Sequence, residues 1–219
     1  MVAQLLSQFE LLLNKPQLPD SLVNSNPNLR PISRELIQGY FLSISNTASQ
    51  DITLGLDFVV NTQSGGTPFS VGSPGDLEKT VAIFYDVEGK NEIFGVNATS
   101  IQIASVPAGN VPPPNVTTRL TLKIKGFETG LLLVQPNPSL LLNRGSMVEI
   151  RGYLNVFLDP STTGVSDSVN FLFTAEHRGT FYNLDALRMG ELTKVEPDQT
   201  HYPLPISSSN GSLLKVEFE

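Results

Sequence analysis

Hydrophobic and polar residues alternate with a period of two over most of the chain after residue 39. In residues 52–60 and 148–158, for example, apolar side chains occupy every second position and polar ones stand between them. Successive side chains of a β-strand point to opposite faces, so each such stripe predicts a strand with one buried face. The same alternation occurs in residues 40–44, 81–87, 120–124, 169–175 and 214–218.

One-sided burial is typical of antiparallel sheets, because parallel sheets are covered on both faces and give continuous apolar runs. Residues 131–134 form the one continuous run, and residues 92–96 and 100–106 are weaker strand segments. About ten strands must curl or split to bury their apolar side. The pattern therefore predicts an all-β fold, a two-layer antiparallel β-sandwich, with a closed barrel as the alternative.

The first fifteen residues show a different period. Their apolar residues recur at spacings of three and four, which predicts one face of an α-helix: these are Val2, Leu5, Leu6, Phe9, Leu12 and Leu13. Pro16 ends the pattern. The predicted organisation is an amphipathic helix over 1–16, an extended connector over 17–38 that is rich in Pro, Asn and Ser, and a β-sandwich domain over 39–219.

The predicted helix can pack on its own domain or mediate self-association. Docking on a membrane surface is disfavoured, because its polar face lacks the Lys and Arg that anionic lipids attract. Packing on its own domain is the commoner arrangement for such a helix. A homo-oligomer formed through it is the one partner that the sequence suggests, and any other protein partner is unspecified.

Composition excludes several classes of function. The net charge of −7 disfavours nucleic-acid binding, since an acidic surface repels phosphate. The absence of cysteine removes disulfides, thiolate nucleophiles and iron–sulfur clusters. No apolar run reaches the length of a membrane span, and residues 1–15 lack the features of a signal peptide, so a cytoplasmic location is expected.

Motifs for catalysis and for cofactors are missing. A Gly-x-Ser-x-Gly elbow, a P-loop and a dinucleotide fingerprint are all absent from the sequence. The two histidines, His177 and His201, do not have the close spacing of a cupin-type metal site, and both are expected at surface or edge positions without a ligand role. We predict no cofactor and no catalytic residue, and an enzymatic role is less favoured than a non-enzymatic one.

Two weak candidate sites remain. Arg119, Lys123 and Lys125 share one face of a predicted strand and could bind an anion or an acidic partner, but a solvated sheet face that discourages edge pairing is the commoner explanation. Oxygen-bearing side chains in the 159–167 segment resemble the start of a calcium loop: they are Asp159, Ser161, Thr163 and Asp167. Asn170 stands where the closing carboxylate should be, so a turn without metal is the simpler interpretation.

The sixteen-residue segment 61–76 carries no charge until its last position, and loops of this length are often functional. The leading hypothesis is a non-enzymatic interaction or structural β-sandwich module that self-associates. The alternative is a carbohydrate-binding or carbohydrate-hydrolysing sandwich that uses the 61–76 loop. The absence of Trp and the presence of only five Tyr weaken this alternative, since sugar clefts rely on aromatic platforms.

Overall fold

The computed structural model describes most of the 219-residue chain. The described residues are 3–16, 18–32, 34–61, 69–104, 115–142, 146–165, 167–183, 186–187, 189–195, 197–208 and 211–218.

Twelve strands account for most of these residues, and all of their ladders are antiparallel. The strands are β1 (Gln4–Pro16), β2 (Glu35–Asn46), β3 (Ile52–Asn61), β4 (Val81–Val87), β5 (Lys90–Ile93), β6 (Ile101–Ala104), β7 (Asn115–Ile124), β8 (Thr129–Pro136), β9 (Val148–Leu158), β10 (Ser168–Tyr182), β11 (Asp198–Leu204) and β12 (Leu213–Glu217). The predicted all-β class and antiparallel pairing are confirmed.

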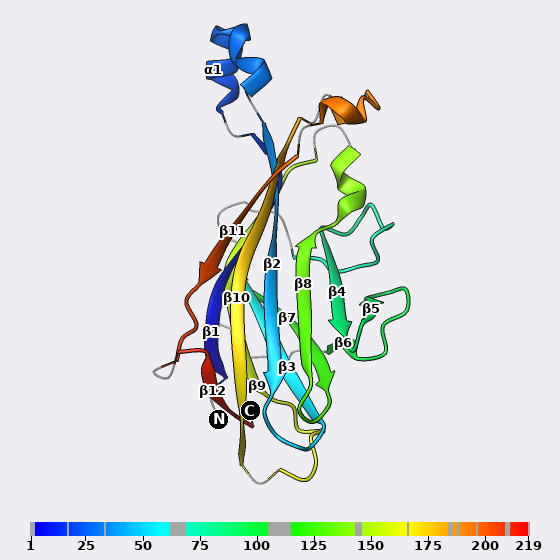
Figure 1. Cartoon of the computed structure of the whole chain (residues 1–219), viewed down its shortest axis with the longest axis vertical. Coiled ribbons are helices and arrows are strands. Elements are labelled where there is room, and N and C mark those ends of the chain that lie inside the picture. Colours follow the sequence, from blue (N-terminus) through cyan, green and yellow to red (C-terminus); the bar gives the residue numbers. More distant parts are fainter. Residues whose placement is uncertain are drawn as a thin grey trace.

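The strands form one hydrogen-bonded sheet that curls almost into a closed barrel (Figure 1). Its main path runs β5-β4-β8-β2-β1-β9-β3-β7-β6, while β10 pairs with β2 and carries β11 and β12 on its other edge. The Glu92 carboxylate of β5 ties the two ends of the path together, because it accepts hydrogen bonds of 2.7–2.9 Å from the amides and hydroxyls of Thr99 and Ser100, just before β6. These bonds lower the pKa of Glu92 although partial burial opposes the shift.

The core lies inside the curled sheet. Alternate residues of β3, such as Leu54, Leu56 and Phe58, are fully buried, and so are the inward residues of β7, β9 and β10. Removal of each such side chain from water contributes about 1.5–3 kcal/mol, which makes this interior the main source of stability. Phe69, which lies outside the named strands, also belongs to this core and stacks on Phe58 with ring centroids 5.4 Å apart.

The predicted helix at 1–16 is wrong, because residues from Gln4 to Pro16 form strand β1. β1 pairs with β9 from Gln4 to Leu13 and with β2 from Leu12 to Pro16, so it lies within the sheet rather than outside it. Self-association through an N-terminal helix therefore has no helix to use, and the oligomeric state itself stays a prediction.

A β-bulge explains the misleading period. The register of β1 against β9 shifts between Leu5 and Ser7, so Leu6 is an extra residue and both Leu6 and Ser7 become buried. After the bulge, Phe9, Leu11 and Leu13 follow the ordinary period of two. The inserted residue and a buried serine together mimic helical spacing.

The predicted extended connector over 17–38 is also corrected. It contains the short helix α1 (Asp20–Ser25) and the 3-10 helix η1 (Pro27–Ile32), and its last four residues already belong to β2. Helix α1 projects beyond one end of the sheet on the connection between β1 and β2 (Figure 1). Its short polar sequence shows no apolar period, which is why the pattern did not predict it.

Aromatic rings lie against three strand glycines. A Cβ atom at Gly55 would lie 2.0 Å from the Phe157 ring, and one at Gly130 would lie 2.2 Å from the Tyr85 hydroxyl. Gly152 lies opposite Phe9 across the β1–β9 ladder. An aromatic side chain over a strand glycine covers exposed backbone and helps to fix the register of neighbouring strands.

The two most deeply buried tyrosines give a matched prediction. The Tyr40 hydroxyl hydrogen-bonds the buried Ser7 hydroxyl at 2.6 Å, whereas the Tyr85 hydroxyl has no hydrogen-bond partner within the described part of the chain. We expect Tyr40→Phe to lower the free energy of unfolding by about 1–2 kcal/mol, because Ser7 is left unsatisfied. Tyr85→Phe should leave this free energy unchanged or raise it by about 1 kcal/mol, since a buried unpaired hydroxyl is removed. Urea denaturation of both variants measures the difference, and a greater loss for Tyr85→Phe would contradict it.

Candidate functional site

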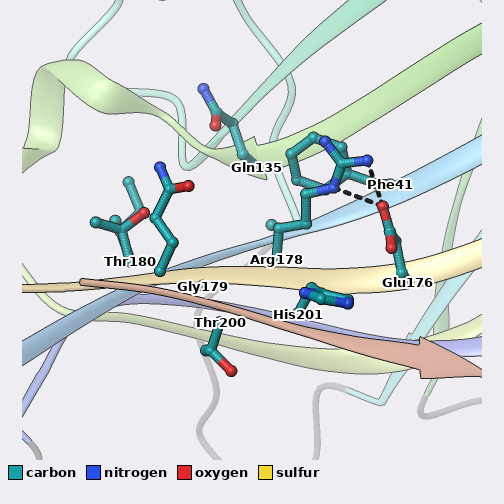
Figure 2. Close-up of a pocket in the computed structure, with 11 residues that line it drawn as sticks. Phe41, Gln135, Glu176, Arg178, Gly179, Thr180, Thr200 and His201 are labelled. Carbon is teal, nitrogen blue, oxygen red and sulfur yellow. Dashed lines mark hydrogen bonds and ion pairs between the residues drawn. The ribbon is translucent and has the colours of Figure 1, made fainter. Parts of the chain in front are cut away.

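A groove of about 530 Å³ crosses the outer face of β8, β2, β10 and β11 (Figure 2). Its volume lies in the range of ligand-binding clefts, about 300–1,000 Å³. The lining consists mainly of polar side chains on paired strands, with two apolar ones: it comprises Ile37, Gly39, Phe41, Gln135, Glu176, Arg178, Gly179, Thr180, Gln199, Thr200 and His201.

The register of β2, β10 and β11 determines which side chains meet in the groove. Gly39 lies opposite Arg178, which in turn lies opposite His201, and Phe41 lies opposite Glu176. Since Gly39 has no side chain, the sheet is hollowed between its larger neighbours on β2 and β10. The hollow is closely bounded on the β8 side, where a Cβ atom at Gly39 would lie 3.1 Å from that of Gln135.

A stacked ion pair lies along one side of the groove. The guanidinium carbon of Arg178 lies 4.4 Å from the centre of the Phe41 ring, and its Nε donates to Glu176 Oε1 at 2.5 Å. Figure 2 shows Arg178 extended over Phe41 with both contacts to Glu176. The Arg178 side chain is 51% exposed and that of Glu176 is 21% exposed, so the cation is oriented but still reachable from solvent.

The groove can form hydrogen bonds of both kinds. Gln135 and Gln199 each offer an amide that donates and accepts, and Thr180 offers a hydroxyl. His201, predicted at a surface or edge position, is exposed and lies in strand β11. These groups can bind a polar ligand in an extended conformation.

His177, the other histidine, lies at the seam between β1 and β10. Its Nε2 accepts the backbone N–H of Glu10 at 2.9 Å, and its ring contacts Tyr40 with centroids 6.3 Å apart. Burial lowers the pKa of His177, while the Glu10 carboxylate opposes this shift. The imidazole therefore acts as a neutral acceptor rather than as a free edge residue.

Of the three predicted anion-binding cations, Lys123 and Lys125 line one cavity of about 320 Å³ that also contains Glu88, Glu92 and Glu128, whereas Arg119 is not part of its lining. Arg119 is buried and forms a double hydrogen bond with Asp57, with both contacts at 2.7 Å. The ammonium group of Lys125 lies 2.7 Å from Glu88, which raises the pKa of Lys125 and lowers that of Glu88. Lys123 lies 3.8 Å from Asp51. Each cation thus has an acidic partner of its own.

The predicted calcium segment adopts a turn. Asp159 Oδ1 accepts the amide of Ser161 at 2.9 Å, and Gly164 has a positive φ of 81°. Thr162 is buried and anchors the segment to β3, because its hydroxyl contacts both the amide and the carbonyl of Thr53 at 3.0 Å. Thr163 and Asp167 are exposed, and calcium binding stays a prediction. Within the described ranges, no group of three or more His, Cys, Asp or Glu side chains could hold a metal ion.

The 61–76 segment lies partly outside the described residues, since 62–68 are not among them. In its described part, Phe69 is buried in the core and Ser70 hydrogen-bonds Thr80. Asn137 anchors the end of the segment, because its amide donates to the carbonyls of Ser73 and Asp76 at 3.1 and 2.7 Å. These contacts fix residues 69–76 to the sheet.

Apart from His201, which was expected at the surface without a ligand role, the groove residues were not predicted from the sequence, although two signals pointed to them. Gly39 interrupts an otherwise apolar strand, and a glycine inside a strand often marks a close approach. Glu176 and Arg178 stand two apart, which puts both on one face of a strand. No pattern in the sequence reveals that these residues of β10 lie beside those of β2.

None of the helices in the described ranges is long and apolar enough to cross a membrane. Comparison with protein-family models, with curated proteins and with solved structures finds no significant match.

Proposed function

We propose that the protein is a non-catalytic interaction module that holds an extended polar segment of a partner protein in the outer-face groove. The observation that carries this proposal is the position of the groove beside β11. Among the described residues, β11 (Asp198–Leu204) pairs only with β10, so its other edge presents unpaired backbone groups next to the groove. Peptide segments commonly bind by adding a strand to such an edge while their side chains enter neighbouring pockets.

The chemistry of the groove supports a peptide ligand. A peptide backbone presents donors and acceptors in alternation, and the amides of Gln135 and Gln199 can satisfy both. The pair of Glu176 and Arg178 offers charges of both signs, with the cation the more exposed of the two. A polar segment that carries an acidic side chain fits this arrangement, because it can share the oriented guanidinium with Glu176.

The carbohydrate alternative receives less support. The Phe41 ring has Arg178 on one face, and Phe69 of the 61–76 segment packs into the core. The exposed tyrosines Tyr153 and Tyr202 are not among the residues that line the groove. An aromatic platform for a sugar ring is therefore missing from the described part of this groove.

Arg178→Ala is expected to weaken peptide binding at least about tenfold, which corresponds to about 1.4 kcal/mol. The probe is an array of random twelve-residue peptides, screened with the full-length protein and followed by calorimetry on the tightest binder. Gln199→Ala should also weaken binding while keeping every ion pair of the groove. Lys123→Ala, which removes an exposed cation from the outer face of β7, serves as the matched control and should bind like the wild type.

Three outcomes separate the possible partners. Peptide binding that Arg178→Ala abolishes and Lys123→Ala leaves unchanged supports the proposal. Binding to a glycan array with silence on the peptide array overturns it in favour of the carbohydrate alternative. A dimer in light scattering that Arg178→Ala dissociates identifies a second copy of the chain as the bound protein, since β11 would then pair with itself.

A further inference from the structure

The edge of β1 that faces away from β9 is closed in three different ways. From Leu12 to Pro16 it pairs with β2, and at Leu6 its carbonyl accepts the amide of Ser207 at 2.8 Å. Between these points no strand ladder joins β1 to β10 among the described residues. There the backbone of Glu10 forms hydrogen bonds with side chains instead.

Two side chains take the place of a neighbouring strand at Glu10. The Glu10 amide donates to His177 Nε2 at 2.9 Å, and the Gln38 amide donates to the Glu10 carbonyl at 3.4 Å and to its Oε2 at 3.1 Å. Gln38 comes from β2 and His177 from β10, so the three strands meet at this one residue.

We propose that His177 is a pH-sensitive latch: it fastens β1 to β10 while its imidazole is neutral, and it releases this part of the seam when the imidazole gains a proton. The reason lies in the direction of the hydrogen bond. A backbone N–H can only donate, so Nε2 must carry a lone pair, and the single ring proton of the neutral form belongs on Nδ1. An added proton at Nε2 would face the Glu10 N–H, and that amide would lose its acceptor in a half-buried site.

The charged and titratable groups around His177 do not provide a protonated imidazole with a hydrogen bond that replaces the one from the Glu10 amide. The Glu10 carboxylate of β1 is engaged by Arg151 of β9 and by Gln38 of β2. Tyr40 of β2 hydrogen-bonds Ser7 instead, and Tyr202 of β11 lies opposite His177 in the ladder. The neighbouring Glu176 and Arg178 of β10 line the groove on the other face.

A cavity of about 400 Å³ adjoins the latch, so the His177 side chain has space to move away from the Glu10 amide. Gln8, Phe9, Glu10, Arg151, Gly152, His177 and Leu204 line it. Phe9 also belongs to the aromatic cluster of the core, with its ring centre 5.3 Å from that of Phe58. Opening at His177 therefore admits solvent toward the interior along β1.

The pH dependence follows from the direction of the pKa shift. Burial holds the pKa of His177 below the ordinary value of about 6.5, so the unfolded or opened chain binds the proton more readily than the closed one. Stability is thus fully present above pH of about 6.5 and falls as the pH decreases below it. The loss ends once the pH is below the folded-state pKa.

Hydrogen exchange at the Glu10 amide tests the latch in the full-length protein. After correction for intrinsic exchange, we expect its protection to fall with a slope that approaches about tenfold per pH unit below pH 6.5. The Lys123 amide is the control. It lies away from the seam, donates to the Ser100 carbonyl at 2.9 Å, and should keep its protection. His177→Gln supplies an acceptor that does not titrate, so this variant should lose the pH dependence, whereas His201→Gln should keep it.

Two results would overturn the latch. One is protection at Glu10 that stays constant from pH 7.5 to 5 in the wild type. The other is an NMR titration in which His177 has a pKa at or above 6.5, and this second measurement needs no variant, so it decides the matter even if His177→Gln does not fold. Neither result bears on peptide binding in the outer-face groove.

Discussion

Asp57→Ala is expected to lower the free energy of unfolding by about 3–5 kcal/mol, a cost typical of breaking a buried ion pair by removing one partner. Asp57 and Arg119 are 7% and 6% exposed, and both of their hydrogen bonds measure 2.7 Å. Arg119 also lies 4.3 Å from the centre of the buried Phe157 ring. Removal of the carboxylate leaves the guanidinium desolvated beside an aromatic ring, without the group that balances its charge.

A double variant and a surface pair provide the controls. Asp57→Leu with Arg119→Met removes both charges and should recover much of the stability, since apolar replacements of buried pairs are often neutral or stabilising. Asp51→Ala breaks the exposed contact with Lys123 together with a long, exposed hydrogen bond of 3.3 Å from the Gly126 amide, and it should cost less than about 1 kcal/mol. Denaturant melts that give Asp57→Ala and Asp51→Ala the same cost would contradict this account of the pair.

Gly152→Ala is expected to cost about 3 kcal/mol or more. A Cβ atom at this position would lie 2.1 Å from the backbone oxygen of Val59 and 2.9 Å from the Phe9 ring. The nearer obstacle is backbone of the adjacent β3 strand, so no side-chain rotation relieves the clash, and the β3–β9 ladder has to shift.

Gly75→Ala is the matched control, because nothing lies within 4 Å of the added methyl group. Its effect on the free energy of unfolding should stay within about 0.5 kcal/mol. Calorimetric melting of the two variants gives the comparison. Equal melting temperatures would show that the close approach at Gly152 is not a constraint on the sheet.

Alternation alone was sufficient to predict most of the sheet. The stripes at 52–60, 81–87 and 148–158 coincide with β3, β4 and β9, since each of these strands buries one face against the core. A tight turn at Glu88 and Gly89, both with positive φ, joins β4 to β5. In these segments the local pattern and the tertiary environment agree.

The first strand could not be predicted because its pattern depends on a partner. Ser7 points inward only because Tyr40 supplies a buried hydrogen bond, and Leu6 is inserted by a bulge against β9. Neither condition is visible in residues 1–16 alone. A buried polar residue and an extra apolar one therefore changed the apparent period from two to about three and a half.

The burial of Arg119 and the position of the groove could not be predicted for the same reason, because both depend on residues of neighbouring strands. Arg119 resembles Lys123 and Lys125 in the sequence, yet only Arg119 faces Asp57 directly across the β3–β7 ladder and becomes buried. The groove likewise depends on the register that brings Gly39 of β2 opposite Arg178 of β10, which is 139 positions away in the chain. Spacing within one strand shows which residues share a face, but it does not show which strands are neighbours.

The most direct test of the proposed binding groove is an NMR titration of the isotope-labelled full-length protein with the tightest peptide from the array. We expect amide shifts to concentrate on β2, β10 and β11, around Gly39, Arg178 and Gln199, and Arg178→Ala to remove them. Saturable binding with shifts clustered elsewhere, for example on the outer face of β7 around Lys123, would contradict the assignment of the groove as the binding site.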